Sequence, residues 1–274
     1  MSRLIVSADD FGLTEGINNG IIKSFKEGIV TSASLMANMP SFEHAVDLAR
    51  RNPDLAAGIH LNLLKGRPLQ TISKVPSLVN TEGIFHTLPE FIKRLLLRKI
   101  VIDELESELR SQIERILATG LKAAHLDSHR HFHIYPPILR VIIKLAKEYE
   151  INKIRCPLGI SIFIPSAKEL ILTSLSWRSR SILKKNNIKH NQRFFDLVKI
   201  ENSQNPSIAF ARFCEQLGQG VTELDCHPGF VTGELDGVEA TIHNRGKQIE
   251  ILTDPSILKL LQKYEVKLIS YDDI

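Results

Sequence analysis

The chain has 274 residues, of which 43% are hydrophobic and 24% are charged, and this composition excludes an intrinsically disordered protein. Its formal net charge of +4, from 35 basic and 31 acidic residues, is too small for a dedicated nucleic-acid binder. Three irregularly spaced cysteines and no apolar run near the roughly 20 residues of a membrane span favour a reducing, cytoplasmic location.

Short β-branched runs alternate with longer helical patterns along the whole chain. We predict strands at Leu4–Ala8, Val30–Met36, Ala56–Asn62, Ala123–Ser128, Lys153–Cys156, Val221–Cys226 and Lys267–Ser270. Helices are predicted at Thr14–Lys26, Ser41–Arg51, Pro89–Arg98, Ile102–Thr119, Pro137–Tyr149, Pro206–Leu217 and Pro255–Tyr264. Such alternation is typical of βα units around a parallel sheet. The pattern therefore predicts an α/β protein, a single-domain irregular (β/α) barrel over residues 1–274.

The stretch Leu158–Arg193 differs from the rest of the chain because it holds seven basic residues and one acidic residue. An inserted helix pair with a solvated basic face is the simplest interpretation, and a surface for an anionic ligand or a membrane is the alternative. The stretch follows a predicted strand end, so we expect it on the active-site face. There Lys184, Lys185 and Lys189 would guide an amphiphilic or anionic substrate.

Two carboxylates stand at the end of the first predicted strand. Asp9 and Asp10 follow an apolar run and precede Gly12, at the position where barrel enzymes carry catalytic groups. Neighbouring side chains on a regular strand point to opposite faces, so both can serve one site only where the backbone turns. The alternative for one of them is to cap the helix that begins near Thr14.

Two histidines stand alone near the ends of other predicted strands. His60 alternates with apolar residues, and His227 leaves a strand just before Pro228 and Gly229. Proline fixes the chain direction and glycine permits close approach of a ligand, so His227 is suited to act as an acid or a base. The alternatives are a satisfied core group for His60 and a backbone-bonded turn histidine for His227.

The densest polar cluster is HLDSHRHFH at 125–133, where one aspartate and four histidines occupy nine positions. While the strand continues, Asp127, His129, His131 and His133 would share one face. Neutral imidazoles are common ligands of zinc and similar ions, and a nearby aspartate can orient them. A solvated polar loop is the alternative. Together with the other strand-end motifs, this cluster is typical of an active site assembled at a barrel mouth.

The chain resembles the YdjC-like family, which includes chitooligosaccharide deacetylases and hopanoid-biosynthesis-associated deacetylases. The matching segments are ADDFG at Ala8–Gly12, TSASLM at Thr31–Met36, GIHLNL at Gly58–Leu63, DSHRHFH at Asp127–His133, IRCP at Ile154–Pro157, HPGF at His227–Phe230 and NRGKQIE at Asn244–Glu250. The resemblance implies an irregular (β/α) barrel. It also implies a metal-dependent hydrolase that removes the N-acetyl group from a chito-oligosaccharide or an N-acetylglucosaminyl glycolipid and releases acetate.

The resemblance also assigns roles to individual residues. Asp10, His60 and His129 are expected to hold one divalent metal ion, Zn or Mg, although spacing alone does not exclude His131 as a ligand. Asp9 is the expected general base, which would deprotonate the attacking water. His227 is the expected acid, which would protonate the departing amine.

Substrate contacts are expected from Arg155, Asn62, His131 and Arg245. The chain departs from the family pattern at Asp196, where relatives often have glycine, and this puts the substrate-side loop in question. The expected partner is an N-acetylated sugar and not a nucleic acid. A peripheral membrane contact and a homodimer are further hypotheses.

Three other functions compete with this interpretation. A glycoside hydrolase on a barrel uses two carboxylates, but it does not explain the histidines. A metal-dependent phosphoesterase suits a His-x-His pattern, but it needs further bridging carboxylates. A non-catalytic sugar-binding or metal-storage protein is the third alternative. The sugar-binding module is disfavoured because aromatic residues make up only 6% of the chain, with one tryptophan.

Overall fold

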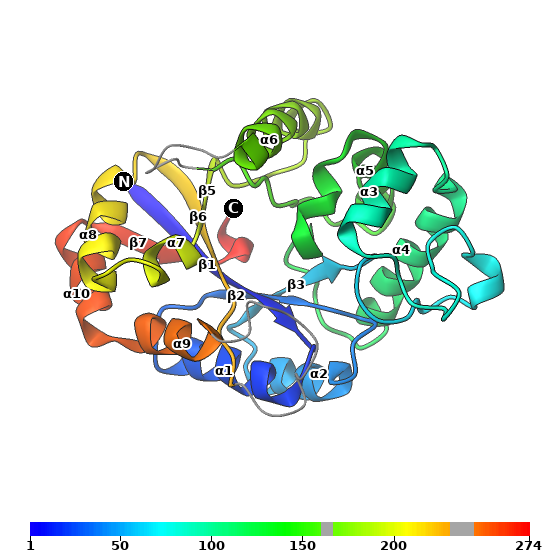
Figure 1. Cartoon of the computed structure of the whole chain (residues 1–274). Helices are drawn as coiled ribbons and strands as arrows, with labels where there is room; N and C mark the ends of the chain where they lie inside the picture. Colours follow the sequence, from blue (N-terminus) through cyan, green and yellow to red (C-terminus); the bar gives the residue numbers. More distant parts are fainter. Residues whose placement is uncertain (160–166, 231–243) are drawn as a thin grey trace.

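The computed structural model describes residues 1–159, 167–230 and 244–274, without the side chains of 167–169, 171 and 172 (Figure 1). In these residues seven parallel strands form one sheet of order β4-β3-β2-β1-β6-β5, with β7 beside β1. The strands are β1 Ser2–Phe11, β2 Ser32–Leu35, β3 Ala56–Leu61, β4 Leu126–Ser128, β5 Arg193–Asp196, β6 Gly220–Cys226 and β7 Val266–Ile269.

Isolated bridges close this sheet into a ring. Leu126 of β4 pairs with Ile154, and Phe194 of β5 pairs with Gly159, so the segment 153–159 joins the two edge strands. The order of β1 to β6 around the ring then follows the chain, as expected when each crossover connects neighbouring parallel strands, whereas β7 pairs with β1 outside this order. The predicted irregular (β/α) barrel is confirmed.

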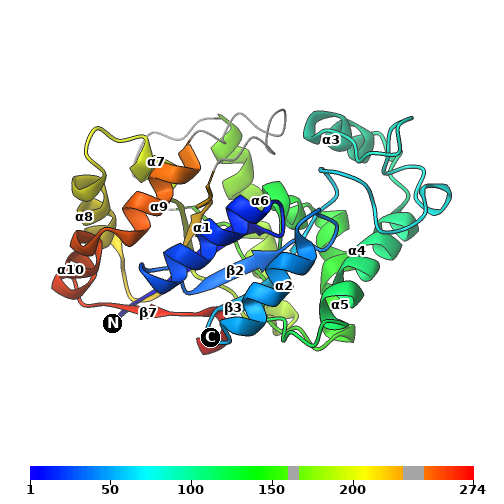
Figure 2. The same cartoon turned by 90° about the horizontal axis from the view of Figure 1, so that it is seen from below.

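Helices surround the strands (Figure 1), and Figure 2 shows α1 and α2 lying across β2 and β3. The α-helices are α1 Glu15–Lys26, α2 Phe42–Arg51, α3 Leu88–Leu96, α4 Ile102–Leu117, α5 Pro136–Glu148, α6 Ala167–Lys185, α7 Val198–Glu201, α8 Pro206–Gln216, α9 Arg245–Thr253 and α10 Pro255–Lys263. Short 3-10 helices are η1 Ile72–Lys74, η2 His129–Ile134 and η5 Tyr271–Asp273. No described helix has the length and apolar character needed to cross a membrane.

Several helix starts follow from local sequence chemistry. The hydroxyl of Thr14 accepts a hydrogen bond from the Ile17 amide at 3.2 Å, and the Asn205 side chain accepts one from Ile208 at 3.1 Å. Such caps satisfy amide groups that have no partner within the helix. Because Thr14 caps α1, the capping role that was the alternative for Asp9 or Asp10 is wrong.

The barrel interior is polar near the carboxyl ends of the strands and apolar at the opposite end, which we call the base. At the base, the strand starts and the last turn of the chain enclose a small apolar cluster, made by Ile5, Ala56, Ala124, Val221, Ile269 and Tyr271. The Tyr271 ring stacks on His125 with 3.6 Å between ring centroids. A side chain at Gly58 would place its Cβ 2.2 Å from the His125 ring, so glycine is needed there. This plug seals the end of the barrel opposite the strand ends that carry the predicted site.

The predicted strand Lys153–Cys156 forms only isolated bridges among the described residues. The Asn191 side chain takes the place of a strand ladder, since it accepts from the Cys156 amide at 2.7 Å and donates to the Cys156 carbonyl at 2.9 Å.

Strand β5 and helices α7 and α9 were absent from the prediction. β5 is only four residues long, begins at the last residue of the basic stretch and has no alternating pattern.

The basic stretch does not fold as predicted. Its described part holds one helix, α6, instead of a helix pair, while residues 160–166 lie outside the described residues. Lys184 and Lys189 line a pocket with Arg3 and Val221, which begin β1 and β6. A helix that follows a barrel strand runs back toward the strand starts. The expectation that these lysines reach the barrel mouth is therefore wrong.

Candidate metal and catalytic site

Asp9 and Asp10 both reach the site because β1 bends at its end. Asp10 has a φ of 67°, and the pairing of β1 with β2 shifts register between Ala8 and Phe11. A non-glycine residue in this left-handed region carries backbone strain, which the surrounding structure has to offset. Both carboxylates then approach His60 of β3, with one oxygen of each 3.8 Å from a ring nitrogen.

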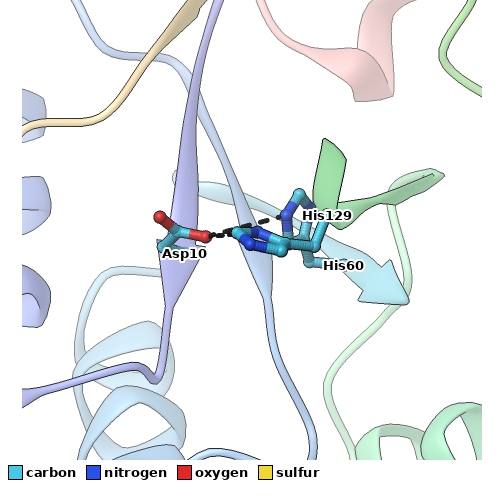
Figure 3. A group of neighbouring side chains, drawn as sticks. All are labelled: Asp10, His60 and His129. Carbon is cyan, nitrogen blue, oxygen red and sulfur yellow. Dashed lines mark hydrogen bonds and ion pairs between the residues drawn. The ribbon is translucent and has the colours of Figure 1, made fainter. Parts of the chain in front are cut away.

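Three buried side chains converge at this end of the barrel (Figure 3). An Asp10 oxygen lies 3.1 Å from His129 Nδ1 and 3.8 Å from His60 Nε2, and all three donor atoms lie within 4.8 Å of one another. Atoms that share one zinc ion at about 2.0–2.2 Å are roughly 3–4 Å apart. One carboxylate and two imidazoles at this spacing fit a single divalent cation.

Asp127 of β4 fixes the orientation of His60. Its carboxylate lies 2.7 Å from His60 Nδ1, which leaves Nε2 directed at Asp10. An outer carboxylate of this kind sets the tautomer and the angle of a metal-binding imidazole. Burial lowers the pKa of His60, but the charges of Asp127 and Asp9 outweigh burial and raise it to about 9. His60 is therefore protonated at neutral pH in the metal-free protein.

Strand β4 ends at Ser128, so the histidines that follow do not share one face. His129 meets Asp10, whereas His133 Nδ1 lies 2.7 Å from the Ser128 hydroxyl and its Nε2 lies 3.1 Å from the Arg155 carbonyl. His131 has a φ of 55° and turns its ring edge toward a phenylalanine of β5. The backbone turn in η2 thus separates histidines that an extended strand would have aligned.

Arg155 fixes the position of Asp9 by hydrogen bonds. Its guanidinium donates to both oxygens of Asp9, at 2.6 and 2.8 Å, and also to Glu223 at 2.8 Å. Burial would raise the pKa of Asp9, but the Arg155 charge outweighs burial and lowers it. Arg155 is 0% exposed, and this burial argues against the expected substrate contact. The geometry indicates that it positions an ionised Asp9.

His227 follows β6 and lies near Asp9 and Asp225, with one donor atom of each within 4.8 Å of the others. Burial lowers the pKa of His227 despite the nearby Asp10 and Asp9 charges. Burial and the Asp9 charge raise the pKa of Asp225 well above its usual value. Asp225 was not predicted from the sequence, although its place two residues before His227, on an alternating strand, was a signal.

Comparison with known proteins places this chain in a family. The family model for YdjC-like protein matches residues 3–263. The chain belongs to the YdjC-like family. A protein named Carbohydrate deacetylase from Brevibacillus brevis is 34% identical over 273 residues, 99% of each chain. Another of that name, from Clostridium beijerinckii, is 33% identical over 272 residues, 99% of this chain and 100% of the other.

The fold of this YdjC-like protein also matches a solved structure. A protein of Enterococcus faecalis V583, provisionally described as a cellobiose-phosphate cleavage protein, has a TM-score of 0.81. It is 26% identical, and the match covers 99% of this chain and 98% of the other. The agreement over both full lengths supports the irregular barrel as the architecture of the whole chain.

The remaining expected substrate residues of this YdjC-like protein differ in their exposure. Asn62 is fully buried, and its amide donates to Asn38 at 2.9 Å and to the Lys65 carbonyl at 2.7 Å, so it orders the loop after β3. Arg245 is buried and pairs with Asp10. His131 is half-buried, and none of the candidate metal groups in the described residues includes it. Among these three, His131 is the one whose exposure suits a substrate contact.

Proposed function

We propose that this YdjC-like protein is a metal-dependent carbohydrate deacetylase that removes the N-acetyl group from an acetylated amino sugar and releases acetate. The observation that carries the proposal is the convergence of Asp10, His60 and His129 beside an ionised Asp9. Relatives named Carbohydrate deacetylase, which match this chain over nearly its full length, support the same activity.

The donor set suits a divalent cation on chemical grounds. Asp10, His60 and His129 would supply one oxygen and two nitrogens from residues that are at most 7% exposed. Two imidazoles favour zinc over magnesium among common ions. When bound, the cation would polarise the acetyl carbonyl group and lower the pKa of a water molecule.

Two side chains of the protein would accept and donate the protons. Asp9, fixed by two hydrogen bonds from Arg155, would act as the base that accepts a proton from the attacking water. His227 would donate a proton to the departing amine nitrogen. Because its lowered pKa favours the neutral ring, His227 has to acquire that proton within the site. Asp9 lies within 4.8 Å of it, close enough for transfer through one bridging water.

We expect the purified protein to release acetate from N-acetylated sugars, and to lose this activity with a chelator and regain it with zinc or magnesium. The panel should include a chito-oligosaccharide and an N-acetylglucosaminyl glycolipid, with acetate measured enzymatically. Cellobiose and a phosphate monoester serve as controls for glycosidase and phosphoesterase activity. Chelator-sensitive hydrolysis of either control without acetate release from any amide would overturn the proposal.

Metal affinity should increase with pH, by about tenfold per unit between roughly pH 6 and 8. His60 has a pKa of about 9 without metal, so below that pH a proton occupies the ring that has to bind the cation. Raising the pH removes this competition. Competition titration with a chromogenic chelator measures the affinity. The Asp127→Asn variant should show a shallower dependence, because Asp127 is the charge that raises this pKa most; a flat wild-type profile would contradict the assignment.

A further inference from the structure

A pocket of about 410 Å³ lies at the opposite end of the barrel from the candidate site. Its walls come from the starts of β1 and β6, the last turns of α6, the segment before β5 and the end of the chain. The lining residues are Arg3, Arg180, Lys184, Ile188, Lys189, His190, Gln192, Val221, Asp273 and Ile274. The volume is within the range of roughly 300–1,000 Å³ that is usual for small-molecule sites.

The lining is strongly basic, and its basic side chains outnumber its acidic ones. Asp273 is its acidic side chain, and it is engaged by the Ser270 amide at 2.8 Å. Lys189 donates to the Ile274 main-chain oxygen at 3.0 Å. Within the described part of the chain, Arg3, Arg180 and Lys184 form no ion pair. Basic side chains gathered around one hollow in excess of acidic ones repel one another, and an anionic ligand would relieve this repulsion.

Arg180 supplies a second, independent observation. Its guanidinium lies 5.5 Å from the Trp177 ring centroid, but its Nε is buried with no hydrogen-bond partner among the described residues. A buried donor without an acceptor is unfavourable unless a ligand or a water satisfies it. His190, 8% exposed, lies on the same wall, and burial and the charges of Arg180 and Lys184 lower its pKa. The charges of Arg180 and Lys184 therefore both affect His190 on the same wall of the pocket.

We propose that this pocket binds a soluble phosphorylated small molecule, with its phosphoryl group paired to Arg180 and Lys184. Guanidinium and ammonium groups are the usual partners of phosphate oxygens in proteins, the first through parallel N–H donors and the second as a point charge. A recess lined by nearly buried groups such as His190 and Val221 admits a small molecule better than a flat lipid surface. The ligand is distinct from the acetylated sugar, which belongs at the other end of the barrel.

The test is calorimetric titration of the full-length protein with glucose 6-phosphate, inorganic phosphate and glucose. Saturable binding of glucose 6-phosphate is expected, with no binding of glucose. The double variant Arg180→Gln/Lys184→Gln should weaken binding by at least about tenfold. Lys185→Gln is the matched control, because Lys185 is an exposed neighbour on α6 outside the lining, and its affinity should stay unchanged. Circular dichroism and thermal melting check that the variants fold.

Two further measurements distinguish this pocket from the candidate metal site and from a membrane surface. The His60→Ala variant should bind glucose 6-phosphate as the wild type does, since His60 lies at the opposite end of the barrel. Inorganic phosphate that binds as tightly as the ester would support the proposal, with the phosphoryl group as the whole recognition element. Equal binding by wild type and double variant would overturn it. Binding only to vesicles of phosphatidylglycerol, with none to soluble phosphates, would also overturn it in favour of a membrane surface.

Discussion

Replacement of Asp9 by asparagine is expected to lower kcat by about 10²–10⁴-fold while the metal stays bound. Asparagine keeps the shape and one of the two acceptor oxygens for Arg155, but its neutral amide cannot take a proton from water. Asp10→Asn should lose both the metal and turnover, because Asp10 would be the carboxylate of the ligand set. Metal analysis of the purified variants, together with steady-state kinetics on an N-acetylated sugar, measures the two effects separately.

The matched control is Asp225→Asn in the same buried cluster. Burial and the Asp9 charge raise the pKa of Asp225, which favours its neutral form, so a neutral amide changes the local charge less at Asp225 than at Asp9. Its effect on kcat should be far smaller than that of Asp9→Asn. Equal metal loss in the Asp9 and Asp10 variants would show that the roles of these adjacent carboxylates are assigned wrongly.

The second large effect is expected at the histidines: His60→Ala or His129→Ala should abolish metal binding and activity. Either change removes one of three protein ligands, and nothing in the described shell replaces its nitrogen. Asp127→Asn should have a smaller effect, about 10–100-fold in affinity, because Asp127 orients His60 without belonging to the proposed Asp10–His60–His129 set. Metal content after dialysis and equilibrium titration would rank the variants.

His131→Ala is the matched control for the histidine variants. It lies two residues from His129, but its ring faces Phe194, at 5.1 Å between centroids. This variant should keep the metal and change KM on the sugar if His131 contacts substrate. If His131→Ala alone empties the site, the ligand assignment moves from His129 to His131.

Charge balance in the barrel explains why these residues occur together. Arg155 lies 2.8 Å from Asp127 and 3.8 Å from Asp225, and it contacts both Asp9 and Glu223, so one buried cation serves four acidic side chains. Buried charges are costly unless they are paired, and removal of one partner leaves the others uncompensated. In the metal-free protein, the proton on His60 contributes a further positive charge. A bound cation would take over that contribution as His60 becomes neutral.

The sequence by itself determined the parts of this protein that depend on local chemistry. Hydrophobic periodicity and caps placed β1, β3, β6 and most of the helices within a few residues, because alternation and capping act over one or two turns. Parallel strands present their carboxyl ends at the same edge of a barrel. The positions of Asp9, Asp10, His60 and His129 at strand ends therefore predicted that they lie at one end of the barrel.

Only the tertiary structure decided what depends on partners far apart in the chain. Arg155 looked like a substrate residue, but its interactions with Asp9 and Glu223 join residues 146 and 68 positions away and place it beneath the site. The direction of α6 likewise determined that Lys184 and Lys189 lie at the barrel base. Local patterns report which face of an element is apolar, whereas packing against distant elements decides which side chains remain exposed.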